Sequence, residues 1–577
     1  GPGPVFAFES LIAARRWQVY ALRATYVGVL LAGLALTWGP ADRARYSPAE
    51  AAAVGRLLLD TVIAVQLAAV LLAAPAATAG AVCVDKARGT LIHAFVTDLS
   101  DREIVLGKLG ARLAPVLGLL ACGLPVLALG SFLGGIDLVA VIGAELVTAG
   151  VAVLCCTVAL IASVWARKPH QALLLAYLVV GLWVVLVPAS LLLFPIGPPT
   201  SGMGQAWVLS NPIVAAFVAE LSWPIWRPGL REQAAFFLVT LLVSWLPIAL
   251  ASRRLRPTVL AQANRPQKRE RPDAPARLLD YLPGPPLDGN PVLWREWHRK
   301  RPSRWTGRFW TAYAIVSALA SLYVIGFYYF WWGHGLIYSG IQVVAAQVNA
   351  WQVSVGLLLL SVSAATALAE ERDRGSLDVI MTTPLTTREI VWGKWWGTFA
   401  MVPRLAILPI WVSAGAAMIT GGAIGLVLMI GQILAYAAVI TSLGLALATW
   451  IPRLGRVITV SVMAYVLVAL GWPLVLQVLS ILPAFRMTAI QMGSNWDGLN
   501  LASPFFGIYA TTEWAARWWY GTESSFWSGF RPTVIYNDPT WPLIWIGVDL
   551  AIALILAFAT LRTFDRCLGR VPETRPV

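Results

Sequence analysis

Long apolar stretches separated by short charged segments dominate this sequence. Six lie in the first half of the chain, near residues 21–38, 58–80, 113–130, 138–164, 173–194 and 234–251. Six more follow near residues 309–332, 353–369, 398–419, 424–450, 457–482 and 541–561. Each is close to the ~20 residues that a helix needs to cross ~30 Å of hydrocarbon. The pattern predicts an all-α, polytopic membrane protein with about twelve transmembrane helices, arranged as two six-helix repeats.

An amphipathic stretch precedes each set of spans, at residues 5–20 and at residues 292–308. Each mixes Trp or Phe with Arg or Lys, which is typical of a helix that lies in the membrane interface. We therefore expect two interfacial elbow helices, although a plain cytoplasmic start to the first span would give a similar pattern. The expected domains are a first permease-like half at 1–256, a basic Pro-rich linker at 257–288, and a second half at 289–577 with a long external segment at 483–540.

Composition agrees with the membrane interpretation. The chain is 58% hydrophobic and 12% charged, with a mean hydropathy of +0.71, whereas soluble domains carry about 25% charged residues. The net charge of +14 is concentrated between Arg253 and Arg308, where 14 Lys and Arg stand against five Asp and Glu. Positive loops stay in the cytoplasm, so we expect an integral protein of a bacterial inner membrane with both termini cytoplasmic. No basic-aromatic recognition module is visible, so nucleic acid is not an expected partner.

Catalytic and metal-binding patterns are missing from the sequence. The five cysteines have no zinc-ligand spacing, and only four histidines are present. No Ser/His/Asp arrangement, paired-carboxylate site or HExxH motif occurs. We therefore expect no metal site and no enzymatic activity of the chain itself.

An internal repeat carries the functional argument. Residues 83–108 read CVDKARGTLIHAFVTDLSDREIVLGK and align without a gap on residues 369–394, which read AEERDRGSLDVIMTTPLTTREIVWGK. Both segments keep an Arg-Gly pair near the start and end on Arg-Glu-Ile-Val followed by Gly-Lys. Such a long polar match between apolar segments indicates a duplication, so both halves carry the same loop between their second and third spans.

Each copy of this loop predicts a helical hairpin. Gly89 and Gly375 are suited to end the extension of the second span. Thr90 and Ser376, the residues that follow, are predicted to cap a short helix.

Capping boxes should then start the third spans. Ser100 stands three residues before Glu103, and Thr386 three residues before Glu389. In this arrangement the hydroxyl and the carboxylate each accept a hydrogen bond from a backbone N–H at the start of the helix. The loop is therefore either a well-made hairpin without a partner or a docking surface presented twice, and we favour the docking surface.

The second copy of the loop resembles the permease subunits of ABC-2-type (type V) ATP-binding-cassette exporters, through the pattern E-x-R-x-G-[ST]-L…TTPL[ST]xREIxxGK. In that family this loop is the coupling helix that contacts the ATPase. The resemblance covers nearly the whole chain, once per half, but the first half has Asp85 where the family prefers Glu and Asp98 where it has Pro. By this resemblance the candidate ATPase-coupling residues are Asp85, Lys86, Arg88, Gly89, Arg102, Glu103, Lys108, Glu370, Glu371, Arg372, Arg374, Gly375, Pro384, Arg388, Glu389 and Lys394.

The phosphate-cradling loop G-x-x-x-x-G-K-[ST] is missing, as is any long polar domain that could house an ATPase. The expected partners are therefore two copies of a separate ABC ATPase subunit, which would bind ATP and Mg, together with membrane lipids. We leave open other membrane or external subunits. No cofactor is expected on this chain.

Three ionisable residues fall inside predicted spans: Glu145, Arg404 and Asp549. Such groups are costly in hydrocarbon and often functional, and the two carboxylates lie at similar depths, so they could face one cavity. The ordinary alternatives are a snorkelling Arg and carboxylates that accept buried hydrogen bonds. A secondary transporter is a weaker hypothesis, because Gly431 stands at the position aligned with Glu145. A mechanical signalling component and a membrane-embedded enzyme are further alternatives, and nothing in the sequence selects a substrate.

Overall fold

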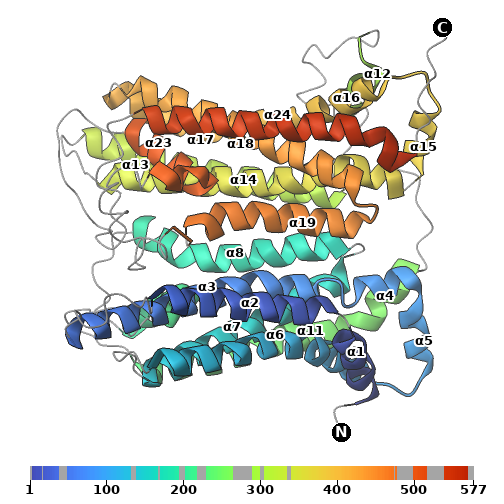
Figure 1. Ribbon diagram of the computed structural model, residues 1–577, viewed down its shortest axis with the longest axis vertical. Helices are drawn as coiled ribbons and strands as arrows, with labels where there is room; N and C mark the ends of the chain where they lie inside the picture. The colour runs from blue at the N-terminus through green and yellow to red at the C-terminus, as the bar shows by residue number, and fades with distance from the viewer. Residues whose placement is uncertain are drawn as a thin grey trace. The chain divides into compact units, whose positions relative to one another are not determined.

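The computed structural model describes residues 3–569 of the chain with some gaps. It leaves out residues 1–2, 16, 38–47, 132–137, 167–168, 194–201, 218–228, 264–288, 299–303, 334–339, 374, 421, 474, 477–497, 516–538 and 570–577. Every regular element in the described part of the chain is a helix (Figure 1). The described residues divide into two compact units, called unit 1 (within 1–271) and unit 2 (within 272–577). The all-α, polytopic class predicted from the sequence is confirmed.

Unit 1 is built around α7, a helix that is buried on most of its surface. Val147, Val151 and Leu160 of α7 have no solvent exposure, and the helix packs against α3, α8 and α11. The helices of unit 1 are α1 (Pro4–Ala14), α2 (Trp17–Thr37), α3 (Pro48–Thr78), α4 (Cys83–Arg88), α5 (Thr90–Val96), α6 (Asp101–Ser131), α7 (Leu138–Trp165), α8 (Pro169–Leu193), α9 (Gly202–Leu209), α10 (Pro212–Ala216) and α11 (Leu230–Ala263).

Unit 2 is built around α14 and α18, which pack against each other and against α23. Helix α18 has no charged residue, and inside hydrocarbon a helix satisfies every backbone group within itself. The α-helices of unit 2 are α12 (Pro291–His298), α13 (Arg304–Gly333), α14 (Gly340–Asp373), α15 (Ser376–Met381), α16 (Thr387–Phe399), α17 (Val402–Thr420), α18 (Ala423–Trp450), α19 (Leu454–Val466), α23 (Pro504–Ala515) and α24 (Thr540–Leu568).

Eight helical stretches in the described residues are long and apolar enough to cross a membrane. They are Val62–Lys86, Asp101–Ala128, Leu138–Trp165, Leu230–Ala261, Ala345–Asp373, Thr387–Met418, Ala423–Trp450 and Thr540–Leu568. The other four expected spans overlap the helices α2, α8, α13 and α19, and residues 477–482 of the last of these spans lie outside the described residues. A helix therefore stands at each of the twelve expected places, while the number that cross the membrane stays a prediction.

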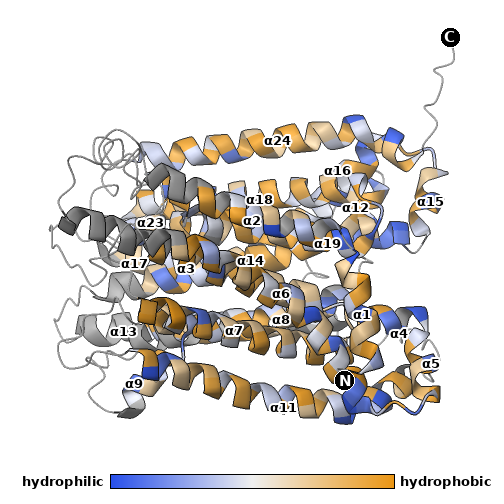
Figure 2. Ribbon diagram, turned by 60° about the horizontal axis from the view of Figure 1, so that its bottom comes forward, coloured by the Kyte–Doolittle hydropathy of each residue, from blue (hydrophilic) through white to orange (hydrophobic). Residues whose placement is uncertain are grey.

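Both expected elbow helices are present as separate helices, α1 and α12, each followed by a span-length helix. Asn290 starts α12, because its side-chain oxygen accepts hydrogen bonds of 3.0 Å from the backbone N–H groups of Val292 and Leu293. Helix α11 continues to Ala263 and so occupies the first residues of the expected 257–288 linker. In each unit, polar residues gather at the end where the short helices of the connecting loop lie (Figure 2).

Candidate functional site

A buried ion cluster in unit 2 joins three helices at the connecting loop. The Nζ atom of Lys394, on α16, lies 2.5 Å from an oxygen of Glu296 on α12 and 2.5 Å from an oxygen of Glu371 near the end of α14. Arg295 also pairs with Glu371. The side chains of Lys394 and Glu296 are only 1% and 2% exposed. Two cations and two anions therefore neutralise one another, and the Lys394–Glu296 pair among them is shielded from water.

Unit 1 contains the same cluster. Lys108 of α6 pairs with Glu9 of α1 at 2.7 Å and with Asp85 of α4. The second cation here is Arg112, whose guanidinium lies 3.1 Å from the other oxygen of Glu9. In both units, ion pairs thus connect the elbow helix to the end of the second span and to the start of the third span.

Sequence positions explain why the two clusters correspond. Lys108 aligns with Lys394, and Asp85 with Glu371, within the internal repeat. Glu9 ends the segment GPVFAFE and Glu296 ends the similar segment NPVLWRE. These two glutamates were not among the candidates, although their matching segments could have identified them. The fourth member differs, because Arg112 comes from the third span and Arg295 from the elbow helix.

Close packing of the elbow helix against glycines supports each cluster. A Cβ atom added at Gly393 would lie 2.8 Å from Cβ of Val292, and one added at Gly107 would lie 2.9 Å from Cβ of Val5. Such separations are too short for real contacts. Each elbow helix can therefore reach the lysine beside it because the adjacent residue is glycine.

Both glycines at the loop turns behave as predicted. Gly89 and Gly375 have φ angles of 73° and 71°, in the left-handed region that favours glycine. The prediction that Thr90 and Ser376 cap the short helices is wrong. The glycines occupy the cap positions, and the two hydroxyls donate backwards to the carbonyl oxygens of Asp85 and Glu371, at 3.4 and 3.2 Å. The left-handed turn brings the two helices so close together that the residue after glycine is already helical.

The predicted capping boxes are present at both third spans. Glu103 accepts a hydrogen bond of 2.8 Å from the backbone N–H of Ser100, whose hydroxyl accepts one of 3.3 Å in return. In unit 2, Glu389 likewise accepts a hydrogen bond of 2.7 Å from the backbone N–H of Thr386, and the hydroxyl of Thr386 accepts one of 3.2 Å from the backbone N–H of Glu389. Each third span therefore starts at a defined residue, which fixes where its lysine lies.

Lys86 and Arg372 share a second repeated role. Lys86 donates to the carbonyl oxygens of Val164 and Ala166, at 2.8 and 2.5 Å, at the end of α7. Arg372, its aligned counterpart, lies 3.4 Å from the carbonyl oxygen of Thr449 near the end of α18. A cation at a helix C-terminus satisfies carbonyls that lack an intrahelical partner. These two residues therefore hold the loop to the fourth span.

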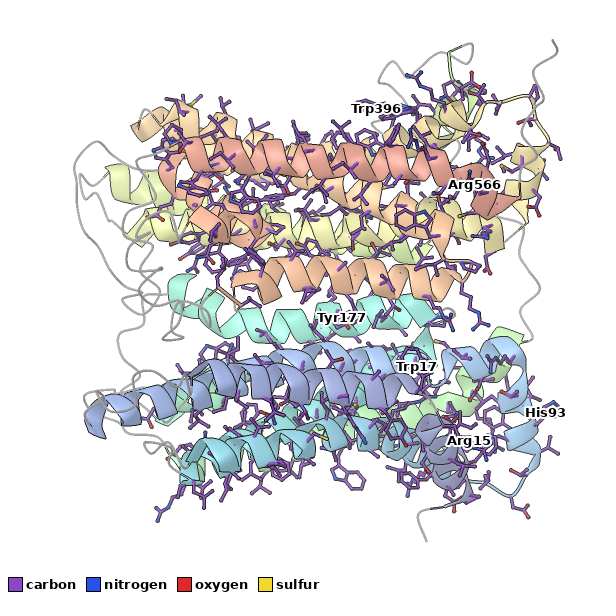
Figure 3. The ribbon with its side chains drawn as sticks, viewed as in Figure 1. Arg15, Trp17, His93, Tyr177, Trp396 and Arg566 are labelled. Carbon is purple, nitrogen blue, oxygen red and sulfur yellow. The ribbon has the colours of Figure 1, made fainter. Side chains whose placement is uncertain are left out.

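The remaining loop candidates lie towards solvent. Glu370 and Glu389 are half-buried, and Arg374 lies outside the described residues. Three apolar side chains of the short helices are also exposed, with 44% for Ile92, 83% for Val96 and 67% for Val379. Figure 3 shows His93 on α5, at the tip of the unit 1 loop. Exposed members of the candidate set are Arg88, Arg102, Glu103, Pro384 and Arg388.

The three charges inside predicted spans have different surroundings. Both oxygens of Glu145 accept hydrogen bonds of 2.8 Å from the amide of Gln66, whose own oxygen accepts one of 3.0 Å from Tyr26. Asp549 is buried, and one of its oxygens has no partner among the described residues. Arg404 is exposed near the start of α17. A cavity shared by Glu145 and Asp549 would join the two units and stays a prediction.

The fold defines an α-helical integral membrane protein with a repeated, fastened connecting loop. Residues 351–561 match the family model described as ABC-2 family transporter protein. The match begins within α14, includes the second loop with Glu371 and Lys394, and ends within α24. This part of the chain is therefore similar to ABC-2 transporter proteins, and the similarity supports a membrane permease of an ABC transporter. No curated protein matches the chain significantly.

Proposed function

We propose that both halves of the chain together form the permease of an ATP-driven exporter, with one ABC ATPase subunit docked on each connecting loop. ATP and Mg would be bound by those two ATPase copies and not by this chain. The observation that carries the proposal lies in the first half, which the family model does not match: unit 1 repeats the ion cluster of unit 2 at aligned positions. A loop that only connects two spans would not need the same ion cluster in both halves.

The clusters suit the transmission of force. A loop that an ATPase pushes must move its spans rather than bend away from them. Lys394 ties the loop's carboxylate Glu371 to the elbow helix through Glu296, and Lys108 does the same in unit 1. A buried charge that is left without its partner costs about 3–5 kcal/mol, so the helices joined at Lys394 should move as one body. On this proposal the cluster residues are positioning residues, and the exposed residues of α5 and α15 contact the ATPase.

The short helices offer a suitable docking surface. Val96 and Val379 expose apolar side chains at the polar end of each unit, where water alone would favour polar ones. Asp98 and Arg388 lie in the same loops and are exposed. An apolar centre with charges around it is the composition of a protein interface.

Single glutamates introduced into this surface test the proposal. The complex of the chain with its copurifying ABC ATPase would be reconstituted in nanodiscs, with Val96→Glu, Val379→Glu and the control Ala206→Glu, which alters an exposed residue of α9. We expect both loop variants to lose bound ATPase and at least tenfold in ATP hydrolysis, and the control to retain both. Full ATPase binding by both loop variants, or ATP hydrolysis by the chain alone, would contradict the proposal.

Transport and topology are separate questions with their own measurements. Flux of a labelled substrate in vesicles, driven by ATP, distinguishes an exporter from a mechanical signalling component, which would hydrolyse ATP without flux. We also propose that the loops and both termini face the cytoplasm of a bacterial inner membrane, because of the basic 253–308 stretch. Cysteines placed at Ala276 and Ser525 should then react with an impermeant label from opposite sides. Labelling of both from one side would refute this topology.

A further inference from the structure

An apolar groove of about 530 Å³ opens on unit 2 beside the elbow helix. It lies among α12, α16, α17 and α18, and every lining side chain among the described residues is aliphatic or aromatic. Trp396, Ile407 and Leu434 of the lining are 50%, 61% and 42% exposed, so the groove is open to the surroundings of the unit. Figure 3 shows Trp396 on α16, close to α12. In an integral membrane protein, such a surface faces lipid.

The length of the groove corresponds to one leaflet. Along α17 it runs over the nine residues from Val402 to Ile410, a rise of about 12 Å at ~1.5 Å per residue. Half of the hydrocarbon thickness is about 15 Å. One end lies at Trp297 on the elbow helix, next to the buried Glu296 of the ion cluster, and the lining reaches Leu434 in the middle of α18. The groove therefore extends from the elbow helix to the middle part of α18.

A hydrogen-bond donor without an acceptor lies at the interfacial end. The indole nitrogen of Trp297, which lines the groove, is buried and has no hydrogen-bond partner among the described residues. A buried N–H without an acceptor is unfavourable. Its nitrogen is covered by neighbouring atoms, so pairing requires the ring to turn towards the groove. The ester and phosphate oxygens of a lipid are acceptors at this depth.

Unit 1 closes the corresponding place with its own side chains. Gly110 stands at the position aligned with Trp396, and a Cβ atom added there would lie 3.0 Å from the ring of Phe6 on α1. Ser10 stands at the position of Trp297 and bonds its own helix through the carbonyl of Ala7. The elbow helix of unit 1 thus lies directly on the third span. The open groove is a property of the second half and not of the duplicated fold.

We propose that the groove is a binding site for one acyl chain of a glycerophospholipid, taken from the leaflet on the side of the connecting loops, with the lipid's ester group at Trp297. The apolar lining, the one-leaflet length and the unpaired donor at the interfacial end all fit this ligand. Neither the ATPase nor the transport substrate enters the argument, so the proposal stands independently of the exporter function. A bound lipid would wedge between the elbow helix and the third span, beside the ion cluster.

Photolabelling of the full-length chain tests the proposal. The chain would be placed in nanodiscs of phosphatidylethanolamine and phosphatidylglycerol that contain a phosphatidylglycerol with a diazirine near the end of one acyl chain. After irradiation, mass spectrometry would locate the label. We expect peptides around Ile410 and Ile433 to carry at least fivefold more label than the lipid-exposed face of α24 around Ile555, which is 67% exposed. Equal labelling of the two places would show ordinary annular lipid and overturn the proposal.

Two substitutions sharpen the result. Ile407→Trp should fill the groove and lower its labelling at least fivefold, whereas Ala121→Trp, at the aligned and exposed position of unit 1, should leave it unchanged. Trp297→Phe keeps the groove apolar but removes the donor, so less phospholipid should remain bound when the detergent-extracted chain is weighed by native mass spectrometry. Unchanged labelling in Ile407→Trp, or phospholipid retention in Trp297→Phe equal to that of the unaltered chain, would contradict the site. The comparison with α24 needs no variant and holds even if a variant fails to fold.

Discussion

Replacing Lys394 by methionine should release the elbow helix of unit 2. The substitution preserves the length of the side chain but removes its charge. Glu296, which is 2% exposed, then loses its nearest cation and is left beside Arg295, whose nitrogen lies 3.8 Å away. Glu371 retains its own pairing with Arg295. One guanidinium must therefore compensate two carboxylates, one of which has no access to water.

The magnitude follows from the burial of the pair. Removing one partner of a buried ion pair costs about 3–5 kcal/mol, because the remaining charge stays desolvated. If this cost is concentrated where α12 packs on α16, local opening of α12 becomes more frequent. At ~1.4 kcal/mol per factor of ten, the opening equilibrium rises about 10²- to 10³-fold.

Hydrogen–deuterium exchange of residues 291–298 measures this opening directly. We expect their amides to exchange about 10²- to 10³-fold faster in Lys394→Met than in the unaltered chain in nanodiscs, while α18 stays protected. The matched variant is Lys108→Met. In unit 1, Arg112 remains on Glu9, and Asp85 is 26% exposed, so water can solvate it. Exchange of α1 should therefore rise by about tenfold or less, the range of a surface ion pair.

The reasoning would be refuted if α12 exchanged at its original rate in Lys394→Met. It would also fail if Lys108→Met and Lys394→Met had equal effects, because the argument depends on the different burial of the two carboxylate sets. Combining Glu296→Gln with Lys394→Met removes both charges, so this double variant should exchange more slowly than Lys394→Met alone.

Two further predictions concern the same region. Gly393→Ala should displace α12 from α16 and destabilise their contact by about 1–3 kcal/mol through overpacking, since the added Cβ would lie 2.8 Å from Val292. The control Gly415→Ala should be neutral, because nothing lies within 4 Å of its Cβ position. Hydrogen–deuterium exchange of α12 is again the measurement. Glu371→Ala should lower ATP hydrolysis of the reconstituted complex more than Asp85→Ala does, because Glu371 contacts both Lys394 and an arginine; equal losses in the two variants would show that the loops are equivalent.

Local features of the fold could be predicted from the sequence because they depend on neighbouring residues. Hydropathy located a helix at each of the twelve expected places. The capping box of Thr386 and Glu389 and the left-handed turn at Gly375 involve residues at most three apart, so their spacing is enough to predict them. The cap expected at Ser376 failed for an equally local reason, because the glycine turn itself became the cap.

The ion clusters could not be predicted in this way. Lys394 and Glu371 were identified as repeated loop residues, and the resemblance placed them at an ATPase contact. Their actual neighbours include Glu296, 98 residues from Lys394, and such distant pairing depends on how the elbow helix packs. The repeat held the missing information, because Glu9 and Glu296 end similar segments in the two halves. A polar residue that both repeats retain can therefore form a contact within the chain as readily as a contact with a partner protein.

The two units share a buried Tyr and Gln pair but differ in the groups to which the Gln side chain donates. Tyr26 and Gln66 of unit 1 align with Tyr313 and Gln352 of unit 2, so the polar pair itself is repeated. In unit 1 the amide of Gln66 donates to Glu145. In unit 2 the amide of Gln352 donates instead to the carbonyl oxygen of Ser317 and to the hydroxyl of Ser321, each at 3.0 Å.

The place of the carboxylate has been filled in unit 2. Gly431 replaces Glu145, and a Cβ atom added there would lie 2.9 Å from the side chain of Ile546. If ion coupling were a property of the duplicated fold, both repeats would carry an intramembrane carboxylate at this position. In unit 1 the carboxylate of Glu145 accepts the hydrogen bonds of Gln66. In unit 2 two serines supply the acceptors for the corresponding Gln352. Both halves retain the lysine with two carboxylates at the connecting loop. This favours transport driven by an ATPase outside the membrane over transport coupled to an ion within it.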